Sequence, residues 1–268
     1  MNDLRVIWSL AARELVRFFR QRNRVIGALG QPLIFWLLFS AGLGPSFRLP
    51  GSGTGEGGES YAEYFFPGTV ALILLFTAIF ATISIIEDRR EGFLQSVLVA
   101  PIPRWSMVLG KLLGGTLVAV AQGLLFLLLG LTLGLHYSVV SLVAITAFMF
   151  TLALALTGLG FVIAWRMDST QGFHAVMSVF LFPMWLLSGA FFPAEHGWLA
   201  WVLAANPMTY GVAGLRQLLY LHPGAEAGAA TLALPSLATC WIVTLLFAAI
   251  TFAASCKMAG TRTTGDLL

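Results

Sequence analysis

Charged residues are scarce in this chain. Asp, Glu, Lys and Arg make up 10% of its 268 residues, whereas in soluble domains they make up about 25%. Apolar residues make up 58%. A monomer of this composition has too little polar surface to cover itself in water, and a lipid bilayer removes that requirement. The composition therefore excludes a water-soluble fold and leaves no length for a large soluble domain beside several membrane spans.

Cysteine is almost absent, and no catalytic set stands out. Cys240 and Cys256 lie in the last apolar run, and on one helix they would be about 24 Å apart, beyond the reach of a disulfide. We interpret them as packed or lipid-facing thiols. The four histidines fall at the ends of apolar runs or outside them: His136, His174, His196 and His222. Neither a metal site nor a hydrolase site is therefore expected between helices.

A nucleotide-binding loop is also missing. Such a loop needs the pattern G-x-x-x-x-G-K-[ST], because backbone N–H groups and the lysine surround the phosphates. The only Gly-Lys pair, Gly110-Lys111, is followed by Leu112 and lacks the upstream glycine. The chain is therefore not expected to be an enzyme or to bind ATP by this device.

Long apolar runs, in contrast, dominate the sequence. Six of them are long enough to cross about 30 Å of hydrocarbon as helices. They cover residues 25–44, 64–86, 107–134, 139–165, 173–191 and 235–257. Barrel strands are shorter and alternate in character, so a β-barrel is disfavoured. We predict an all-α integral membrane protein with six transmembrane helices in one domain, residues 1–268.

The few charges predict how the spans are oriented. Residues 1–24 carry six arginines. If this segment is cytoplasmic, all basic residues except Arg48 and Arg216 fall on the cytoplasmic side, as the positive-inside rule requires. Both termini are then cytoplasmic, in a bacterial-type inner or plasma membrane. The net charge is +3, and the basic residues are spread along one membrane face. This distribution predicts contact with membrane lipid and not with nucleic acid.

Residues 1–24 also carry an amphipathic pattern. The apolar residues that repeat at helical spacing are Leu4, Ile7, Trp8, Ala11, Leu15 and Phe18. A second line along the same helix consists of Arg13, Arg17, Arg20 and Arg24. This pattern predicts a helix that lies in the cytoplasmic membrane interface. An anchor for anionic lipid with no further role is the alternative.

Two segments between the spans differ in composition from the rest. Residues 45–63 are rich in glycine and predict a flexible outer loop. Residues 192–224 mix tryptophans with Arg216. A seventh span there would put Arg216 at mid-bilayer, at about 2.5–3.5 kcal/mol on insertion scales. We predict instead a re-entrant hairpin of two short helices separated by Asn206-Pro207.

Small and polar residues inside the spans predict how they pack. Gly110-x-x-x-Gly114 and Gly130-x-x-x-Gly134 place glycines on one helix face, which lets backbones approach closely. Gln122 either hydrogen-bonds a neighbouring helix or faces a polar path. Pro183 predicts a bend in the fifth span.

The connection between the second and third spans, residues 87–104, is the most informative segment. A charged run from Glu87 to Glu91 leads into a short amphipathic helix, which two prolines, Pro101 and Pro103, bring to an end. The apolar residues of that helix predict a soluble partner that covers it. A solvated helix resting on lipid headgroups is the alternative.

Two sets of motifs resemble one family. Residues 87–105, continued by Gly110-Lys111-Leu112, resemble the coupling-helix region of the type-2 ATP-binding-cassette (ABC) exporter permeases, which has a charged run, a short helix, a Pro-Ile turn and a Gly-Lys pair. The second set resembles the outer re-entrant pattern of the drug-exporter and nodulation-type branch. It consists of Ser188-Gly189 through Phe192-Pro193, then Asn206-Pro207-Met208-Thr209-Tyr210 and Leu215-Arg216.

The resemblance implies partners and site residues. It implies a homodimer, or a dimer with a similar permease, above two copies of a cytoplasmic ABC ATPase that binds ATP and Mg; this chain itself would bind no cofactor. The implied ATPase-coupling residues are Glu87, Asp88, Arg89, Arg90, Glu91, Gly92, Phe93, Leu94, Gln95 and Pro101. The implied translocation path follows the second and fifth spans, where helical spacing selects Thr69, Phe76, Phe80, Ser84, Met177, Leu181, Met184 and Ser188. A packed helix interface would show the same stripes.

The function expected on this basis is that of a permease subunit of an ATP-driven exporter of amphipathic or hydrophobic small molecules, as in multidrug efflux. An alternative with the same fold is export of a polysaccharide or glycolipid. An ATP-independent secondary transporter is disfavoured because no internal repeat and no midplane carboxylate is present. A structural membrane anchor for a soluble complex is a further alternative.

Overall fold

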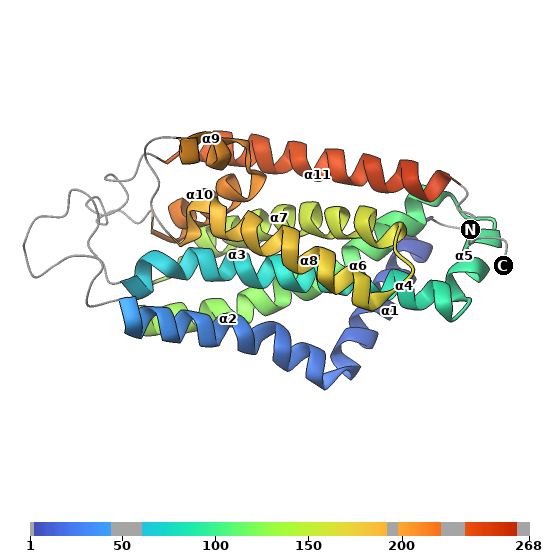
Figure 1. The fold of residues 1–268 in the computed structure, drawn as a ribbon, viewed down its shortest axis with the longest axis horizontal. Helices are drawn as coiled ribbons and strands as arrows, with labels where there is room; N and C mark the ends of the chain where they lie inside the picture. Colours follow the sequence, from blue (N-terminus) through green and yellow to red (C-terminus); the bar gives the residue numbers. More distant parts are fainter. Residues whose placement is uncertain (1–2, 44–60, 192–197, 221–233, 262–268) are drawn as a thin grey trace, which may run out of the picture.

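The computed structural model of the chain describes residues 3–43, 61–191, 198–220 and 234–261. Within these residues all regular structure is helical (Figure 1). In chain order the elements are α1 (Asp3–Arg20), α2 (Arg22–Leu43), α3 (Tyr61–Ala81), α4 (Ile83–Arg90), α5 (Phe93–Val99), α6 (Arg104–Leu127), η2 (Leu128–Leu133), α7 (Val139–Trp165), α8 (Thr170–Trp185), η3 (Leu186–Ala190), α9 (Trp198–Ala205), α10 (Pro207–Tyr220) and α11 (Leu237–Gly260).

The prediction of an all-α fold with six apolar spans is confirmed. The helices long and apolar enough to cross a membrane are Val25–Leu43, Tyr61–Arg90, Arg104–Leu133, Val139–Trp165, Thr170–Ala190 and Leu237–Gly260. The second span extends further than the apolar run 64–86, because α4 continues α3 through the charged residues to Arg90. The predicted outer loop, apart from its last residues, and the pair Phe192-Pro193 lie outside the described residues.

α3 forms the centre of the bundle. In the most apolar part of the span that α3 begins, 89% of the residues are buried in the protein. The corresponding share for the span in α2 is 11%. α3 packs on α2, α6 and α7, while α6 also packs on α1, and α11 packs on α7. Figure 1 shows α3 between α2 and α7. The spans around α3 therefore keep apolar faces that the chain itself does not cover.

The bundle has two ends with different contents. Figure 1 places α5, the start of α1 and the end of α11 at one end, which we call the α5 end. The opposite end carries α9 and α10, and we call it the α10 end. The start of α1 and the end of α11 thus share a side with the segment 87–104. That this side is cytoplasmic stays a prediction.

Glycines let α1 approach α6 closely. A Cβ atom at Gly110 would lie 2.9 Å from the Cβ of Leu10, and one at Gly114 would lie 2.5 Å from the Cβ of Glu14. These distances are shorter than van der Waals contact, so only glycine fits. The predicted packing role of the first glycine pair is confirmed. In the second pair, Gly134 instead ends η2 with a positive φ of 75°, and a Cβ there would contact nothing.

The apolar residues predicted to form one line along the first helix fall into a buried group and an exposed group. Ile7, Ala11 and Phe18 are buried in the protein, whereas Leu4 and Trp8 are exposed. α1 is therefore held by protein on one side and presents part of its apolar surface outward, as an interfacial helix requires.

A polar contact and a break in helical geometry mark the interior of the bundle. The Thr77 hydroxyl donates to Oε1 of Gln122 at 2.5 Å, which joins α3 to α6 and favours the helix-packing interpretation of that glutamine. Pro183 lies within α8, and the helical geometry is broken only beyond it, at Leu187 and Gly189 in η3.

Replacing Gly114 by leucine is expected to lower stability, because no space exists for a side chain between α6 and α1. Overpacking of this kind costs about 1–3 kcal/mol. The midpoint of thermal unfolding in mild detergent, followed by tryptophan fluorescence, measures it. Gly30→Ala is the control, since an added Cβ there meets nothing within 4 Å. A Gly114→Leu midpoint at or above that of the wild type would contradict the packing described.

Candidate functional site

The α5 end is shaped by a glycine turn and a double proline. After α4, Gly92 adopts a left-handed φ of 76°, a conformation that side chains with a Cβ disfavour. The turn lets the short α5 begin at once in a new direction. Ala100 is extended, and Pro103 immediately precedes α6. The structure thus has the predicted short helix between the charged run and the prolines.

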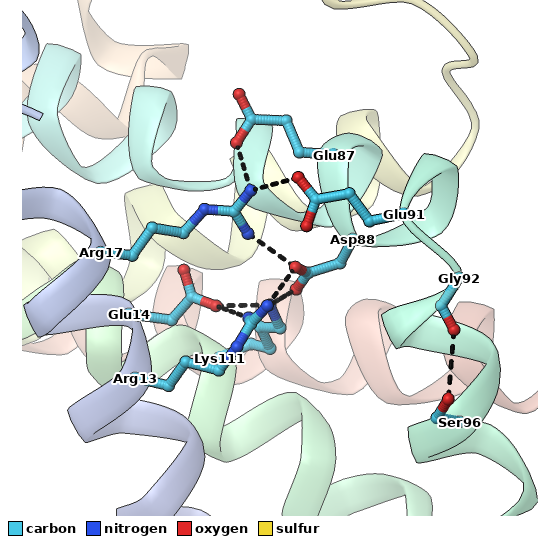
Figure 2. Close-up of polar contacts among 9 residues, drawn as sticks. All are labelled: Arg13, Glu14, Arg17, Glu87, Asp88, Glu91, Gly92, Ser96 and Lys111. Carbon is cyan, nitrogen blue, oxygen red and sulfur yellow. Dashed lines mark hydrogen bonds and ion pairs between the residues drawn. The ribbon is translucent and has the colours of Figure 1, made fainter.

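A cluster of charged side chains lies beside α5. It draws Arg13, Glu14 and Arg17 from α1, Glu87 and Asp88 from α4, Glu91 from the residue that follows α4, and Lys111 from α6. Figure 2 shows these side chains converging from the three helices, with Asp88 at the centre. We call these seven residues the charge cluster. Asp88, Glu14 and Lys111 are buried, and burial of charge is tolerated only where each charge has a partner.

Asp88 accepts from three cations. Arg13 donates to both carboxylate oxygens, at 2.8 and 3.0 Å, and Arg17 donates to Oδ1 at 2.6 Å. Lys111 donates to Asp88 as well, and also to Oε1 of Glu14 at 2.5 Å. The paired, two-point contact with Arg13 fixes orientation as well as distance. The cluster therefore fixes the positions of α1, α4 and α6 relative to one another.

Arg17 joins the buried part of the cluster to its rim. Its guanidinium lies 3.0 Å from Oε2 of Glu87 and 3.2 Å from Oε1 of Glu91. Burial alone would lower the pKa of Arg17, but the negative charges of Asp88, Glu87 and Glu91 outweigh that effect and raise the pKa above its usual value. Arg17 is therefore a permanent cation in this site.

Phe93 connects α5 to the cluster. The Arg13 guanidinium carbon lies 3.7 Å from the centre of the Phe93 ring, and Nζ of Lys111 lies 6.0 Å from it. A cation over an aromatic face is attracted by the ring quadrupole. Leu94 beside it is buried. The other side of α5 is open, since Ser96 is exposed and Val99 is 84% exposed. α5 is thus fixed on one face and free on the other.

Arg89 and Arg90 turn away from the cluster. Arg89 donates to the carbonyl oxygen of Trp165 at 2.7 Å, and Arg90 donates to the carbonyl oxygen of Asp168 at 2.7 Å. These carbonyls lie at and just after the end of α7, where a helix leaves its last C=O groups without partners and favours positive charge. The side chains of the charged run therefore contact two parts of the bundle, the charge cluster and the end of α7.

The predicted coupling residues differ in exposure. Asp88 and Leu94 are buried, Glu87, Arg89, Gly92, Phe93 and Gln95 are partly exposed, and Arg90, Glu91 and Pro101 are exposed. The predicted coupling residues do not include four members of the cluster: Arg13, Glu14, Arg17 and Lys111. The sequence held a usable signal for Glu14, because Glu14 shares the helical face of the buried residues Ile7, Ala11 and Phe18.

The predicted path residues are only partly brought together. Thr69, Ser84, Met177, Leu181 and Ser188 are buried within the chain, and Phe76, Phe80 and Met184 are partly exposed. The rings of Phe76 and Phe80 lie 5.4 Å apart. They line a cleft together with Phe18, Gly27, Ala28, Gln31, Pro32 and Thr77. The structure therefore places Phe76 and Phe80 at a cleft, while Thr69, Met177 and Leu181 are buried.

Within the described residues no group of three His, Cys, Asp or Glu side chains is placed to hold a metal ion, and Cys240 and Cys256 are both free thiols. The site is an ion-paired base that carries a short helix, α5, whose outer face is exposed.

Comparison with known proteins finds one matching family and several similar proteins. The family model described as ABC-2 type transporter matches residues 5–220. The chain is 26% identical over 221 residues to the putative transport permease ycf38 of Cyanophora paradoxa, covering 81% of this chain and 74% of the relative. It is 24% identical over 216 residues to the daunorubicin resistance ABC transporter permease protein DrrB1 of Streptomyces coeruleorubidus, covering 78% and 72%. It is 27% identical over 203 residues to nodulation protein J of Rhizobium leguminosarum bv. trifolii, covering 74% and 75%.

Asp88→Asn is expected to destabilise the protein strongly, because it keeps the shape of the side chain but removes the charge that three cations share. Breaking a buried ion pair costs about 3–5 kcal/mol, measured as a lower midpoint of thermal unfolding in detergent. Asp168→Asn is the control. That carboxylate is 96% exposed and lies 3.7 Å from Arg89, so its replacement should cost about 0–1 kcal/mol. Equal midpoints for the two variants would contradict the role assigned to Asp88.

Proposed function

Because this chain belongs to the ABC-2 type transporter family, we propose that it is the membrane-spanning subunit through which a separate ATPase drives export of amphipathic or hydrophobic small molecules. As an ABC-2 permease it is the transport subunit of an ABC transporter, an integral membrane protein whose ATPase is a separate partner. The direction of transport, its dependence on ATP and the class of cargo are the proposal.

The observation that carries the proposal is the anchorage of α5. Phe93 lies under the Arg13 guanidinium, and that guanidinium also binds the buried Asp88. α4 continues the central span, and α6 begins immediately beyond the prolines. A force applied to the open face of α5 therefore acts on two spans at once. This is the property that a helix moved by a soluble motor needs.

The proposed motor is a cytoplasmic ABC ATPase, present in two copies, that binds ATP and Mg. We place the permease in a dimer, most simply a homodimer, and both of its termini in the cytoplasm. The predicted coupling residues that are exposed, Arg90, Glu91 and Pro101, are proposed to contact the ATPase directly. Asp88 and Leu94 are proposed to act from within, because they are buried.

The proposed cargo follows from the chemistry of the cleft and from a relative. Phe18, Phe76 and Phe80 give the cleft an aromatic lining, to which Gln31 adds a hydrogen-bonding amide. An apolar site with a few polar groups suits an amphipathic compound. The similarity to a daunorubicin resistance permease supports the same class. We therefore propose that the transport path passes Phe76 and Phe80. The roles of the six other predicted path residues are proposed on helical spacing alone.

Val99→Arg is expected to abolish ATP-driven transport without unfolding the chain, because it places a long charged side chain on the exposed face of α5 on which the ATPase is proposed to act. The assay is ATP-dependent uptake of daunorubicin into inside-out vesicles that contain the purified permease and the ATPase that co-purifies with it.

Val139→Arg is the matched control, because Val139 is 81% exposed and lies at the start of α7, far along the chain from α5. It should retain most of the transport. Full uptake by the Val99→Arg complex, or ATP hydrolysis by the permease alone, would contradict the proposal.

A further inference from the structure

The backbone of α8 comes close to other helices mainly near the two ends of α8, and between them Met177 and Leu181 are buried side chains. In the most apolar part of the span that contains α8, only 33% of the residues are buried. Apart from its continuation η3, α8 packs chiefly on α4 and α10, which lie at opposite ends of the molecule (Figure 1). The contacts at both ends are made to backbone carbonyl groups, and they are described in turn.

The first attachment is at the α5 end. Arg89 donates to the carbonyl oxygens of Trp165 at 2.7 Å and Met167 at 3.3 Å, and Arg90 donates to that of Asp168 at 2.7 and 3.2 Å. These residues form the turn that leads directly into α8, whose first turn is capped by Ser169. The side chain of Trp165, at the end of α7, is buried and stacks on Phe161 at 5.3 Å.

The second attachment is at the α10 end. Helical geometry breaks at Leu187 and at Gly189, whose φ is 73°. The break leaves carbonyl groups without helical partners, and in apolar surroundings each of them needs a donor. Asn206, between α9 and α10, donates to the carbonyl oxygens of Met184 at 2.6 Å and Leu187 at 2.8 Å. Its own Oδ1 accepts from the backbone N–H of Met208 at 3.0 Å.

Two further donors close the break. The Tyr64 hydroxyl donates to the carbonyl oxygen of Gly189 at 3.1 Å, and Nη2 of Arg216 approaches the same oxygen at 3.5 Å. Arg216 is buried, and its guanidinium lies 4.2 Å from the centre of the Tyr64 ring. The far end of α8, the start of α3 and the helix α10 are therefore joined at one point.

We propose that α8 is a lever that carries movement from the segment 87–104 to the helices α9 and α10, with Arg89 and Asn206 as the positioning residues at its two ends. This inference rests on the proposed function. A helix is stiff along its axis and α8 spans about 24 Å. Because both ends are held through backbone atoms, the turn before α8 moves with α4, and α9 and α10 move with the far end of α8. Between its ends α8 packs on the bundle through the buried side chains of Met177 and Leu181, and it moves as one stiff body.

The test is made on the full permease in complex with its ATPase in lipid nanodiscs. Trp201 on α9 is 81% exposed and is replaced by a spin-labelled cysteine in a background where Cys240 and Cys256 are serine. The electron paramagnetic resonance spectrum is recorded without nucleotide and after trapping with ATP and vanadate. We expect trapping to change the mobility of the label in the otherwise wild-type complex.

Asn206→Ala is expected to abolish this change while the complex still hydrolyses ATP, because the lever is disconnected at its far end. Arg89→Ala is expected to abolish the change by disconnecting the near end. A merely structural role would instead lower assembly and hydrolysis together. Arg89→Lys should restore the change in part, since an ammonium group reaches one carbonyl where the guanidinium reaches two. If Arg89→Ala does not assemble, Arg89→Lys decides the question, and an undiminished change in that variant overturns the proposal.

Two variants control for loss of a similar bond elsewhere. Arg104→Ala removes an arginine contact to the carbonyl oxygen of Ala259 at 3.4 Å, and Gln217→Ala removes a side-chain bond to the carbonyl oxygen of Pro235 at 2.8 Å. Both bonds lead to α11 or the residues just before it, so both variants should keep the spectral change.

A full change in Arg89→Ala or Asn206→Ala, or no change in a wild-type complex that transports, overturns the lever alone. A wild-type complex that neither hydrolyses ATP nor transports overturns the proposed function with it.

Discussion

The carboxylate of Asp88 has no exposed surface, yet it accepts hydrogen bonds from Arg13, Arg17 and Lys111. A buried charge of this kind is tolerated only while its partners stay in place, since removing one leaves the others desolvated and unpaired. The three partners come from two helices that are distant in the sequence. Their positions are consequently set by one carboxylate, and α5 is attached to it through Phe93. Motion of α5 relative to this base would disrupt the ion pairs, so the region moves as one body.

The arrangement explains how so short a helix is held in place. α5 alone, Phe93–Val99, is too short to be stable in water. It gains its stability from the glycine turn, from the buried Leu94 and from the cation over Phe93. The close approach of α1 to α6 through Gly110 and Gly114 brings Glu14 within reach of Lys111. Backbone packing and charge pairing thus depend on each other in this part of the molecule.

Much of the fold follows from the sequence because it depends on local properties. Long apolar runs predict the spans, helical spacing predicts α1, and Gly110-x-x-x-Gly114 predicts a close helix contact. Pairings between distant segments do not follow, so the sequence does not predict that residues of α1 and Lys111 of α6 pair with Asp88. Periodicity also gives the members of a stripe but not the direction in which it faces. Met177 and Leu181 share a stripe on α8, and tertiary packing turns them into the protein. The same limit applies to Arg89, whose carbonyl partners carry no sequence pattern.

The central claim is that a soluble motor on the cytoplasmic side drives this permease through α5. Ser96 is exposed on that helix, and a cysteine at this position, with Cys240 and Cys256 replaced, reports its location directly. A membrane-impermeant maleimide should fail to label the Ser96→Cys variant in intact cells and should label it in inverted vesicles, where added ATPase should reduce the labelling. Labelling from outside intact cells would contradict the account.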